Sequence, residues 1–402
     1  MRIAIFNSLY YPDIKGGAEI SVKVLAESLQ ELGHEVFVIC SSDRARRRNI
    51  QGVKVFYLPS FNLYSFMDSR KKLLFLRVIW QLLDFFNVFM LIAIWRIVRR
   101  LKPDVLHSNN LAGLSIAPWL VGKVFKIPMV HTLRDYQLLC IMGGGMFRNG
   151  KPCNHQCLGC KLLTYPKRQL SKEIDYVIGN SQFVLDRHLR HGEFPEAKTS
   201  VIYNCYENNH RISSDAKSDK MRFGFIGRLD PVKGVDLLID AFRRADIADA
   251  AELIIAGYGP DTYVRALRQK AADIPVEFLG VVEPAKFFSE VDVVIVPSLW
   301  EEPLSRVIFE AYAHGKPVLG SLRGGTPEIL VEHKTGFLFN TDTPAELSGL
   351  LKRLTNNQAV MGDMSVQCLN ESKKFLPGKV VKEYLDTYQS VLDSARARPI
   401  RA

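Results

Sequence analysis

Short apolar runs alternate with amphipathic segments of helical period along both halves of the chain. The runs stand at residues 3–6, 35–40, 104–107, 128–132 and 175–179, and again at 222–226, 252–256, 276–279, 291–296 and 317–320. Between them lie helix-period segments, such as the one that starts at Ala18 and closes at Gly33. Strands that alternate with helices in this way predict βαβ units, and therefore an α/β protein with parallel sheets.

A polar stretch at residues 207–220 interrupts the alternation and predicts a linker between two domains. The length of 402 residues fits two such domains. We predict two doubly wound, Rossmann-like domains that face a central cleft, over residues 1–206 and 207–378. A last helical pattern at 380–392 predicts that residues 379–402 form a helix crossing back to the first domain.

Four groups of residues at predicted strand ends of the second domain suit a nucleotide or a sugar. They are Arg228 with Lys233, Gly257 with Gly259, Glu302 with Glu310, and the run 324–328. Two cations beside a helix N-terminus can hold a diphosphate, and glycines let a backbone approach a ligand closely. Carboxylates accept hydrogen bonds from sugar hydroxyls, although two glutamates on a solvated helix are the plainer interpretation of that spacing. Together the groups predict a ligand site beyond the strand ends.

These segments resemble a known family. The runs GRLDPVKGVDLLIDAF, AGYGP and EEPLSRVIFEAYAHGKPV are similar to those of the retaining glycosyltransferases of family 4, which have the glycosyltransferase B fold. The runs YYPDIKGGAE and HTLRDYQLLC also match, so the resemblance covers nearly the whole chain. It implies transfer of a sugar from a nucleotide-diphosphate donor to an acceptor hydroxyl with retention of anomeric configuration. Glycan or lipid-linked acceptors, in cell-surface polysaccharide or glycolipid synthesis, are expected.

The resemblance also implies roles for individual residues. Arg228 and Lys233 would bind the donor pyrophosphate, Glu302 the donor sugar and Glu310 the ribose, with Arg228, Lys233 and Glu302 as the catalytic set. Gly16 and Gly17 would let the chain approach phosphate or acceptor, Gly257 and Gly259 would line the donor site, and Ser305 and Arg306 would offer backbone amides to the phosphates.

The chain departs from the family pattern at two places. Ser305 stands where the family usually has glycine, and Arg134-Asp135 stands where a His-Asp pair is common. His131, three residues earlier, is a candidate for the missing histidine, or else a packed strand-end residue. Arg134 and Asp135 would then face the acceptor side of the cleft, with Arg134 contacting an anionic acceptor or the leaving phosphate.

Charge and composition narrow the partners. The net charge of +11 and pI of about 9.2 indicate an anionic partner: nucleotide phosphates, nucleic acid or an anionic membrane. The sequence carries no recognition-helix motif and no aromatic platform with interleaved cations, so we expect no nucleic-acid partner. A basic nucleic-acid-binding protein is the alternative from another class. Seven cysteines and no export signal predict a cytoplasmic protein, free or at the cytoplasmic face of the membrane. A synthase of the same fold with a soluble sugar or sugar-phosphate acceptor is the second enzyme hypothesis.

Residues 70–102 are unusually apolar, with basic clusters at both ends. Arg77, Asp84 and Asn87 interrupt a transmembrane segment. The pattern fits an interfacial helix on an anionic leaflet, or equally a core helix of the first domain with cationic ends in water.

Four cysteines, Cys140, Cys153, Cys157 and Cys160, have spacings that suit a structural zinc site, with His155 as a substitute ligand. Reduced, unligated thiols are the alternative. We expect no cofactor to be required for catalysis, since no Asp-x-Asp motif stands at a strand end.

Overall fold

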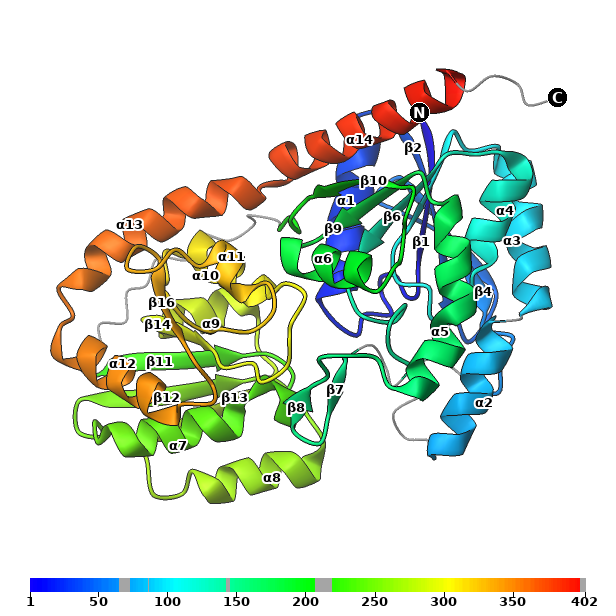
Figure 1. Ribbon diagram of the computed structural model, residues 1–402. Coiled ribbons are helices and arrows are strands. Elements are labelled where there is room, and N and C mark those ends of the chain that lie inside the picture. The colour runs from blue at the N-terminus through cyan, green and yellow to red at the C-terminus, as the bar shows by residue number, and fades with distance from the viewer. Residues whose placement is uncertain (65–72, 86, 142–144, 207–218, 398–402) are drawn as a thin grey trace. The chain divides into compact units, whose positions relative to one another are not determined.

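The computed structural model of the chain describes residues 1–64, 73–85, 87–141, 145–206 and 219–397 (Figure 1). The chain divides into two compact units. The first unit comprises Met1–Met146, Cys153–Cys205 and Pro377–Ala402, and the second comprises Phe147–Pro152 and Tyr206–Leu376. The predicted linker lies almost wholly outside the described residues.

The first unit is built on one eight-stranded sheet with the order β10-β9-β6-β5-β1-β2-β4-β3. Its strands are β1 (Arg2–Asn7), β2 (Glu35–Ser42), β3 (Arg46–Ile50), β4 (Val53–Pro59), β5 (Val105–Ser108), β6 (Met129–Leu133), β9 (Tyr176–Gly179) and β10 (Lys198–Val201). All neighbours pair in parallel except β3 and β4, which form an antiparallel edge. The central strands are almost entirely buried because helices cover both faces of the sheet.

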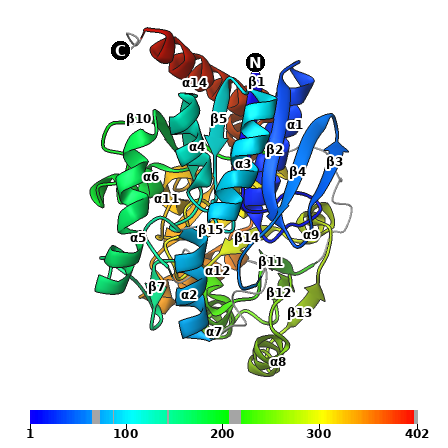
Figure 2. The same cartoon turned by 90° about the vertical axis from the view of Figure 1, so that its right-hand side faces the viewer.

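The helices of the first unit are α1 (Gly17–Glu31), α2 (Leu74–Phe85), α3 (Val88–Leu101), α4 (Ala117–Phe125), α5 (Leu158–Leu170), α6 (Gln182–Arg190) and α14 (Pro377–Ala397), with a short 3-10 turn at Ser171–Glu173. Helices α1 and α14 share a hydrophobic core with the sheet, to which Leu25 and Tyr384 contribute. Figure 2 shows α2 and α3 end to end on the side toward the viewer. The C-terminal helix is thus part of the first unit's core.

The second unit is built on a six-stranded sheet in which all strands are parallel, with the order β13-β12-β11-β14-β15-β16. The strands are β11 (Met221–Ile226), β12 (Ala251–Ala256), β13 (Val276–Gly280), β14 (Val293–Val296), β15 (Val318–Ser321) and β16 (Gly336–Phe339). Numbered from its own first strand, this order is 3-2-1-4-5-6, the order of dinucleotide-binding domains. It reverses between β11 and β14, and this switch point is where such sheets bind ligands.

The remaining elements of the second unit cover both faces of that sheet. They are α7 (Val235–Ala245), α8 (Asp261–Lys270), α9 (Pro284–Glu290), α10 (Arg306–Ala313), α11 (Thr326–Ile329), α12 (Pro344–Asn356) and α13 (Val360–Ser372), 3-10 turns at Pro231–Lys233 and Lys373–Phe375, and the hairpin β7 (Phe147–Arg148) and β8 (Lys151–Pro152). The α/β class and the doubly wound sheets are confirmed, and all ten predicted strands are present.

Six strands were not predicted: the edge strands β3, β10 and β16, the strand β4 next to β3, and the two short hairpin strands β7 and β8. Strand β3 has the sequence Arg-Arg-Arg-Asn-Ile, β10 is largely polar, and β16 has only four residues. Edge strands need only one buried side, so they lack the continuous apolar run that marks a central parallel strand.

Candidate active site

The candidate site of the second unit lies where β11 and β14 end, at the switch point of the sheet. Arg228 follows β11, Lys233 ends the 3-10 turn after it, and Glu302 lies in the loop between β14 and α10. The fold therefore brings together residues that are about 70 positions apart in the chain.

Lys233 and Glu302 form the centre of this site. The ammonium Nζ of Lys233 lies 2.6 Å from Oε1 of Glu302, and the Ser298 hydroxyl donates to Oε2 at 2.8 Å. Nζ also lies 5.7 Å from the centre of the Trp300 ring, within range of a cation–π contact. Both charged side chains are largely buried, which strengthens their attraction over that of a surface pair.

Gly234 places Lys233 against the end of β14. The glycine has φ +74°, and a Cβ there would lie 1.9 Å from the carbonyl oxygen of Pro297. The amide of Leu299 donates to the Val232 carbonyl at 2.9 Å, which fixes the same two segments together. A side chain at position 234 would therefore push the Lys233 turn away from the strand end.

Asp230 orients the second cation. The Arg228 guanidinium Nε lies 3.3 Å from Oδ2 of Asp230, whose Oδ1 also accepts from the Val232 amide at 3.3 Å. The carboxylate thus caps the turn that carries Lys233 while it holds Arg228 at the same strand end. Two cations at one strand end can bind two phosphate groups.

The predicted donor-site glycines Gly257 and Gly259 have a steric role within the unit. Gly257 has φ +136°, and a Cβ there would lie 1.7 Å from the Gly227 carbonyl oxygen. A Cβ at Gly259 would lie 2.1 Å from the carbonyl oxygen of Leu229. The loop after β12 therefore packs directly on the loop that carries Arg228, and this packing by itself requires glycine.

The loop before α10 is fixed by the glycines that follow β15. Oε2 of Glu301 accepts from the Gly324 amide at 2.6 Å, and the Glu302 carbonyl accepts from the Gly325 amide at 2.9 Å. Arg323 lies 3.7 Å from the other oxygen of Glu301. The predicted run 324–328 thus supports Glu302 through the neighbouring glutamate.

Helix α10 begins at Arg306, two residues later than predicted, with Ser305 as its N-cap. Ser305 is buried and its side chain makes no capping hydrogen bond, so it leaves the first amides of the helix available to an anion. Glu310 lies one turn along the helix and pairs with Arg306, whose Nε and terminal nitrogen lie 3.1 and 2.9 Å from Oε1. The pair holds the Glu310 carboxylate near the start of the helix.

Sequence reasoning missed Asp230, Ser298, Trp300 and Glu301. Glu301 directly precedes a predicted site residue, Asp230 lies two positions after one, and Ser298 lies two positions after a predicted strand. Their places in the chain were the only available signal. Their hydrogen-bond partners come from other loops, so these contacts could not be predicted from neighbouring residues.

In the first unit, Gly16 and Gly17 lie in the turn between β1 and α1. The Gly16 amide donates to the Glu19 carboxylate at 2.8 Å, and Gly17 is the first residue of α1. A Cβ on Gly16 would meet only the Glu19 side chain, at 3.8 Å. Internal packing therefore does not explain glycine at position 16, which agrees with a role in approach of a ligand.

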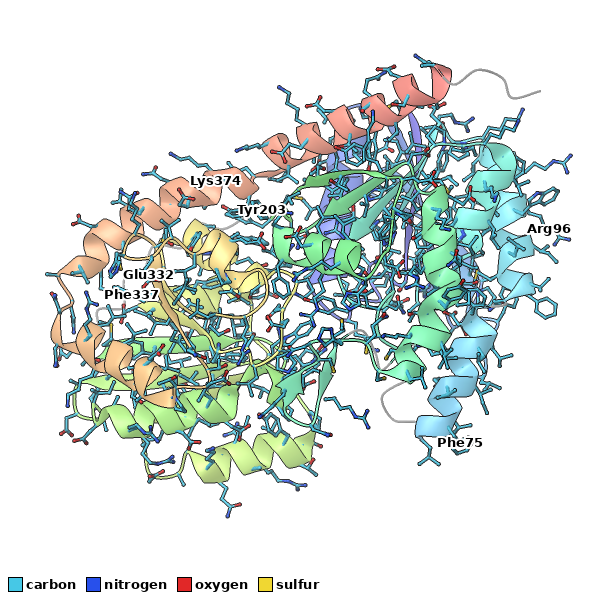
Figure 3. The ribbon with its side chains drawn as sticks, in the orientation of Figure 1. Phe75, Arg96, Tyr203, Glu332, Phe337 and Lys374 are labelled. Carbon is cyan, nitrogen blue, oxygen red and sulfur yellow. The ribbon has the colours of Figure 1, made fainter. Side chains whose placement is uncertain are left out.

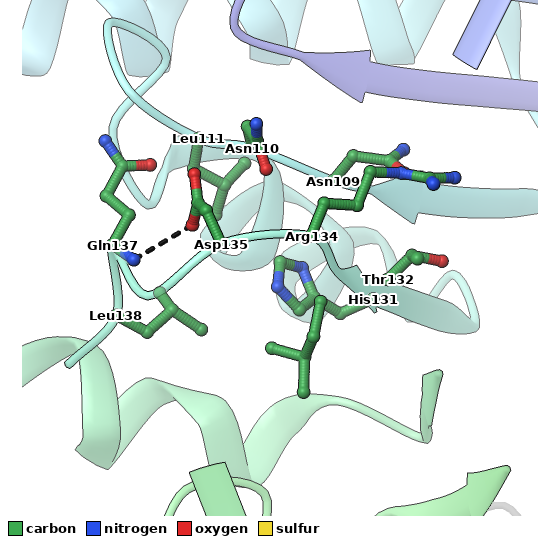
Figure 4. Close-up of a pocket in the computed structure, with 10 residues that line it drawn as sticks. Asn109, Asn110, Leu111, His131, Thr132, Arg134, Asp135, Gln137 and Leu138 are labelled. Atoms are coloured by element: carbon green, nitrogen blue, oxygen red, sulfur yellow. Dashed lines mark hydrogen bonds between the residues drawn. The ribbon is translucent and has the colours of Figure 1, made fainter. Parts of the chain in front are cut away.

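Arg134, Asp135 and His131 gather around a small pocket at the end of β6 (Figure 4). The pocket measures only about 10 Å³, room for about one water. Arg134 is buried, and its guanidinium donates to Asn109 at 2.8 Å, to the Tyr384 hydroxyl at 3.3 Å and to Asn204. The guanidinium thus ties β6 to α14 and to the segment before the linker, which is a structural task.

The side chain of His131 is buried and in contact with three neighbouring side chains. Its Nδ1 shares a hydrogen with Ser108 at 2.8 Å, and its ring stacks on Phe194 and meets Trp119 edge-on, with ring centres 5.4 and 5.3 Å apart. Burial lowers the pKa of His131 to about 3, so the imidazole stays neutral. The geometry is that of a packed histidine in the middle of β6.

Asp135 is the titratable group of this pocket. Its Oδ1 accepts from the Gln137 amide at 2.9 Å (Figure 4), and burial raises its pKa to about 6. Lys167, itself buried, opposes this shift. Asp135 therefore carries a proton more readily than an exposed aspartate does.

Three of the four cysteines of the predicted zinc site lie close to one another. Cys160 lies near the thiols of Cys140 and Cys157, and hydrogen bonding to Cys140, together with burial, raises its pKa. Yet within the described parts of the chain no three His, Cys, Asp or Glu side chains form a set that could hold a metal ion. Zinc needs deprotonated ligands that converge on one point, so zinc binding by these cysteines stays a prediction. None of the four forms a disulfide bond.

Two family models together match most of the chain. Residues 15–209 match the family described as glycosyltransferase family 4, and residues 220–357 match that described as glycosyl transferases group 1. An uncharacterized 42.6 kDa protein in the cps region of Klebsiella pneumoniae is 36% identical over 334 residues, which cover 82% of this chain and 87% of that protein.

Two solved structures share the fold. Sucrose-phosphate synthase from Thermosynechococcus elongatus is 17% identical and superposes with a TM-score of 0.76 over 98% of this chain and 99% of its own. HepE of Anabaena, in complex with UDP and glucose, is 20% identical with a TM-score of 0.72 over 97% and 100%. The chain therefore belongs to glycosyltransferase family 4 and is a glycosyltransferase of the B fold.

Proposed function

We propose that this glycosyltransferase moves a sugar from a nucleotide-diphosphate sugar to an acceptor hydroxyl with retention of anomeric configuration. The observation that carries the proposal is the cluster of Lys233, Glu302 and Ser298, with Arg228 beside it, at the switch point of the second sheet. The UDP and glucose bound to HepE support a nucleotide-sugar donor.

The chemistry follows from the charges at this site. The bond between the sugar's anomeric carbon and the diphosphate oxygen breaks, and the diphosphate leaves with added negative charge. Arg228, Lys233 and the first amides of α10 stabilise that charge without reorganising. The acceptor oxygen bonds to the anomeric carbon from the face that the diphosphate leaves, and the departing phosphate takes the hydroxyl proton.

Glu302 has two tasks in this proposal. One oxygen holds the Lys233 ammonium in place, and the other lies beside the Ser298 hydroxyl, within reach of a sugar hydroxyl. Glu310 would accept hydrogen bonds from the ribose. Neither residue acts as a covalent nucleophile, and no cofactor takes part in the proposed step.

Saturation-transfer NMR against a panel of UDP-, GDP- and ADP-sugars identifies the donor. We expect one nucleotide-sugar to bind through both its base and its sugar. Proton NMR of the first product then gives the anomeric configuration, which should equal that of the donor. A product of inverted configuration would contradict the mechanism while leaving the transferase activity intact.

We further propose that the first unit docks on an anionic membrane through α2 and α3, and that the enzyme works at the cytoplasmic face on a lipid-linked acceptor. Seven apolar side chains of these helices are exposed: Phe75, Ile79, Leu82, Leu83, Val88, Phe89 and Ile92. Phe75 and Arg96 point outward in Figure 3. A contiguous apolar face of this kind normally marks an interaction surface.

Basic residues border this apolar face. Arg96, Arg99 and Arg100 are exposed near the end of α3. Within the described residues, Val78–Leu101 is long and apolar enough to cross a membrane by length and composition alone, with 29% of its most apolar window buried. Asn87 breaks this stretch by capping α3, since its side chain accepts from the Met90 amide at 2.9 Å. Two amphipathic helices with a cationic end are better suited to lie at the membrane surface than to cross the membrane.

Replacing the three arginines by glutamine, in Arg96→Gln/Arg99→Gln/Arg100→Gln, should lower co-sedimentation with anionic vesicles about tenfold or more, because each cation near the surface contributes about 1 kcal/mol. High salt should release the unmodified protein in part. The matched control Arg244→Gln/Lys352→Gln/Lys382→Gln removes the same charge from exposed sites elsewhere. Equal partitioning of the two variants would favour the soluble-acceptor synthase. Lys71 and Lys72, part of the predicted basic cluster, lie outside the described residues.

A further inference from the structure

A second, larger cavity lies in the first unit, apart from the donor site and the β6 pocket. Its volume is about 530 Å³, enough for a group of several heavy atoms. It is formed by α5, α6 and the loop that precedes α5. Six of its lining residues are basic or imidazole side chains: His155, Lys161, Arg168, Arg187, Arg190 and His191.

No acidic side chain lines this cavity among the described residues. Arg187 donates to the Cys153 carbonyl, while its Nε is buried with no hydrogen-bond partner. Arg190 donates to the carbonyl of Asp186 at 3.2 Å rather than to a carboxylate. Four cations around one cavity repel each other, and a buried donor without an acceptor is destabilising. An anion with several oxygen acceptors would relieve both costs.

Arginine geometry narrows the class of anion. Planar guanidinium groups donate in pairs to phosphate and carboxylate oxygens. A phosphate, with three or four oxygens, can meet Arg168, Arg187 and Arg190 at once, while a carboxylate has only two. The cavity therefore fits a phosphate or diphosphate better than a single carboxylate.

An apolar stripe on α5 adjoins the cations. Leu158, Leu162 and Tyr165 are 73%, 65% and 50% exposed and are spaced four and three residues apart, so they lie on one face of the helix. Arg168 lies over the Tyr165 ring, 5.2 Å from its centre. A phosphate that is joined to an apolar chain would contact both features, whereas a phosphate on a polar molecule would contact only the cations.

We propose that this cavity binds a phosphate or diphosphate group of the acceptor. The identity of the ligand as the acceptor rests on the proposed function, whereas phosphate binding at this cavity does not depend on it. The cavity would hold the anionic end of the acceptor, so that selection of phosphorylated acceptors is built into α5 and α6.

Hydrogen-exchange mass spectrometry on the full chain tests this with three probes: glycerol 3-phosphate, dihexanoylphosphatidic acid and the zwitterionic dihexanoylphosphatidylcholine. We expect the two phosphomonoesters to protect peptides from residues 154–168 and 187–191. Lys161→Glu/Arg190→Glu, at two exposed positions, should weaken that binding about tenfold or more, because it replaces charge-assisted bonds by repulsion. The matched variant Lys352→Glu/Lys382→Glu carries the same charge change on exposed sites elsewhere and should bind as the unmodified protein does.

The probes separate the sources of phosphate. Equal protection by both phosphomonoesters indicates a polar phosphorylated acceptor, and protection by the acyl probe alone indicates a phospholipid-like acceptor. No protection at residues 154–191, equal protection by the zwitterionic probe, or equal weakening in both double variants would overturn the proposal. Failure of the donor proposal would appear separately, as absent nucleotide protection at residues 227–234 and 298–310.

Discussion

Arg228→Ala and Lys233→Ala are each expected to lower turnover by about 10²–10³-fold, the loss typical of removing one preorganised donor from a developing anion. Both cations lie at the end of β11, where the diphosphate is proposed to leave. The loss should appear in kcat and in kcat/KM, because these bonds strengthen as charge develops on the leaving group. Steady-state kinetics with the donor found by NMR measures it.

The two variants should differ in stability. Lys233→Ala leaves the largely buried Glu302 without its ammonium partner at 2.6 Å, whereas Arg228 is more exposed. Thermal unfolding should therefore report a lower Tm for Lys233→Ala. Arg244→Ala and Lys352→Ala, at exposed sites on α7 and α12, are the matched controls for lost charge. Turnover within a few-fold of the unmodified enzyme in both site variants would refute the diphosphate assignment.

The second large effect separates the two glutamates. Glu310→Gln should lower the affinity for both the intact donor and the free nucleotide diphosphate by about tenfold. This is the contribution of one hydrogen bond to a charged group. Glu302→Gln should leave the affinity for the free nucleotide diphosphate unchanged. It should lower turnover by a larger factor than Glu310→Gln does. Only Glu302 both positions Lys233 and lies beside the sugar, so only its loss acts on the atoms that change in the transition state.

Calorimetry with the nucleotide diphosphate and turnover with the intact donor, on both variants, decide the assignment. Glu277→Gln, at an exposed position on β13, controls for the loss of one carboxylate. Equal loss of nucleotide affinity in Glu302→Gln and Glu310→Gln would mean that the two roles are wrongly divided.

The sequence predicted the sheets well because central parallel strands are apolar on both faces. Strands β11 and β14 are such runs, and the residues that follow them, Arg228 and Glu302, were found as strand-end candidates. The hairpin strand β3 was missed because three consecutive arginines at a sheet edge have no apolar period.

What the sequence could not supply were partners from distant segments. The Lys233–Glu302 pair joins residues 69 positions apart, and Arg134 bonds to Tyr384, 250 positions away. The resemblance to the family suggested Arg134 as a contact for an anionic acceptor or the leaving phosphate, whereas its hydrogen bonds to buried neighbours show a structural role. The cysteine spacing likewise could not settle a metal site, because ligand geometry depends on how the loop folds.

The return of α14 to the first unit has a consequence for synthesis of the protein. Tyr384 and Tyr388 of this helix are core residues of the first unit, and the Tyr388 hydroxyl bonds His107 on β5 at 2.7 Å. A ribosome makes these residues after the whole of the second unit. Domains normally complete their folding in the order in which they are made. Here the first unit lacks one wall of its core until the second unit has been made, so it completes its core only after the second unit.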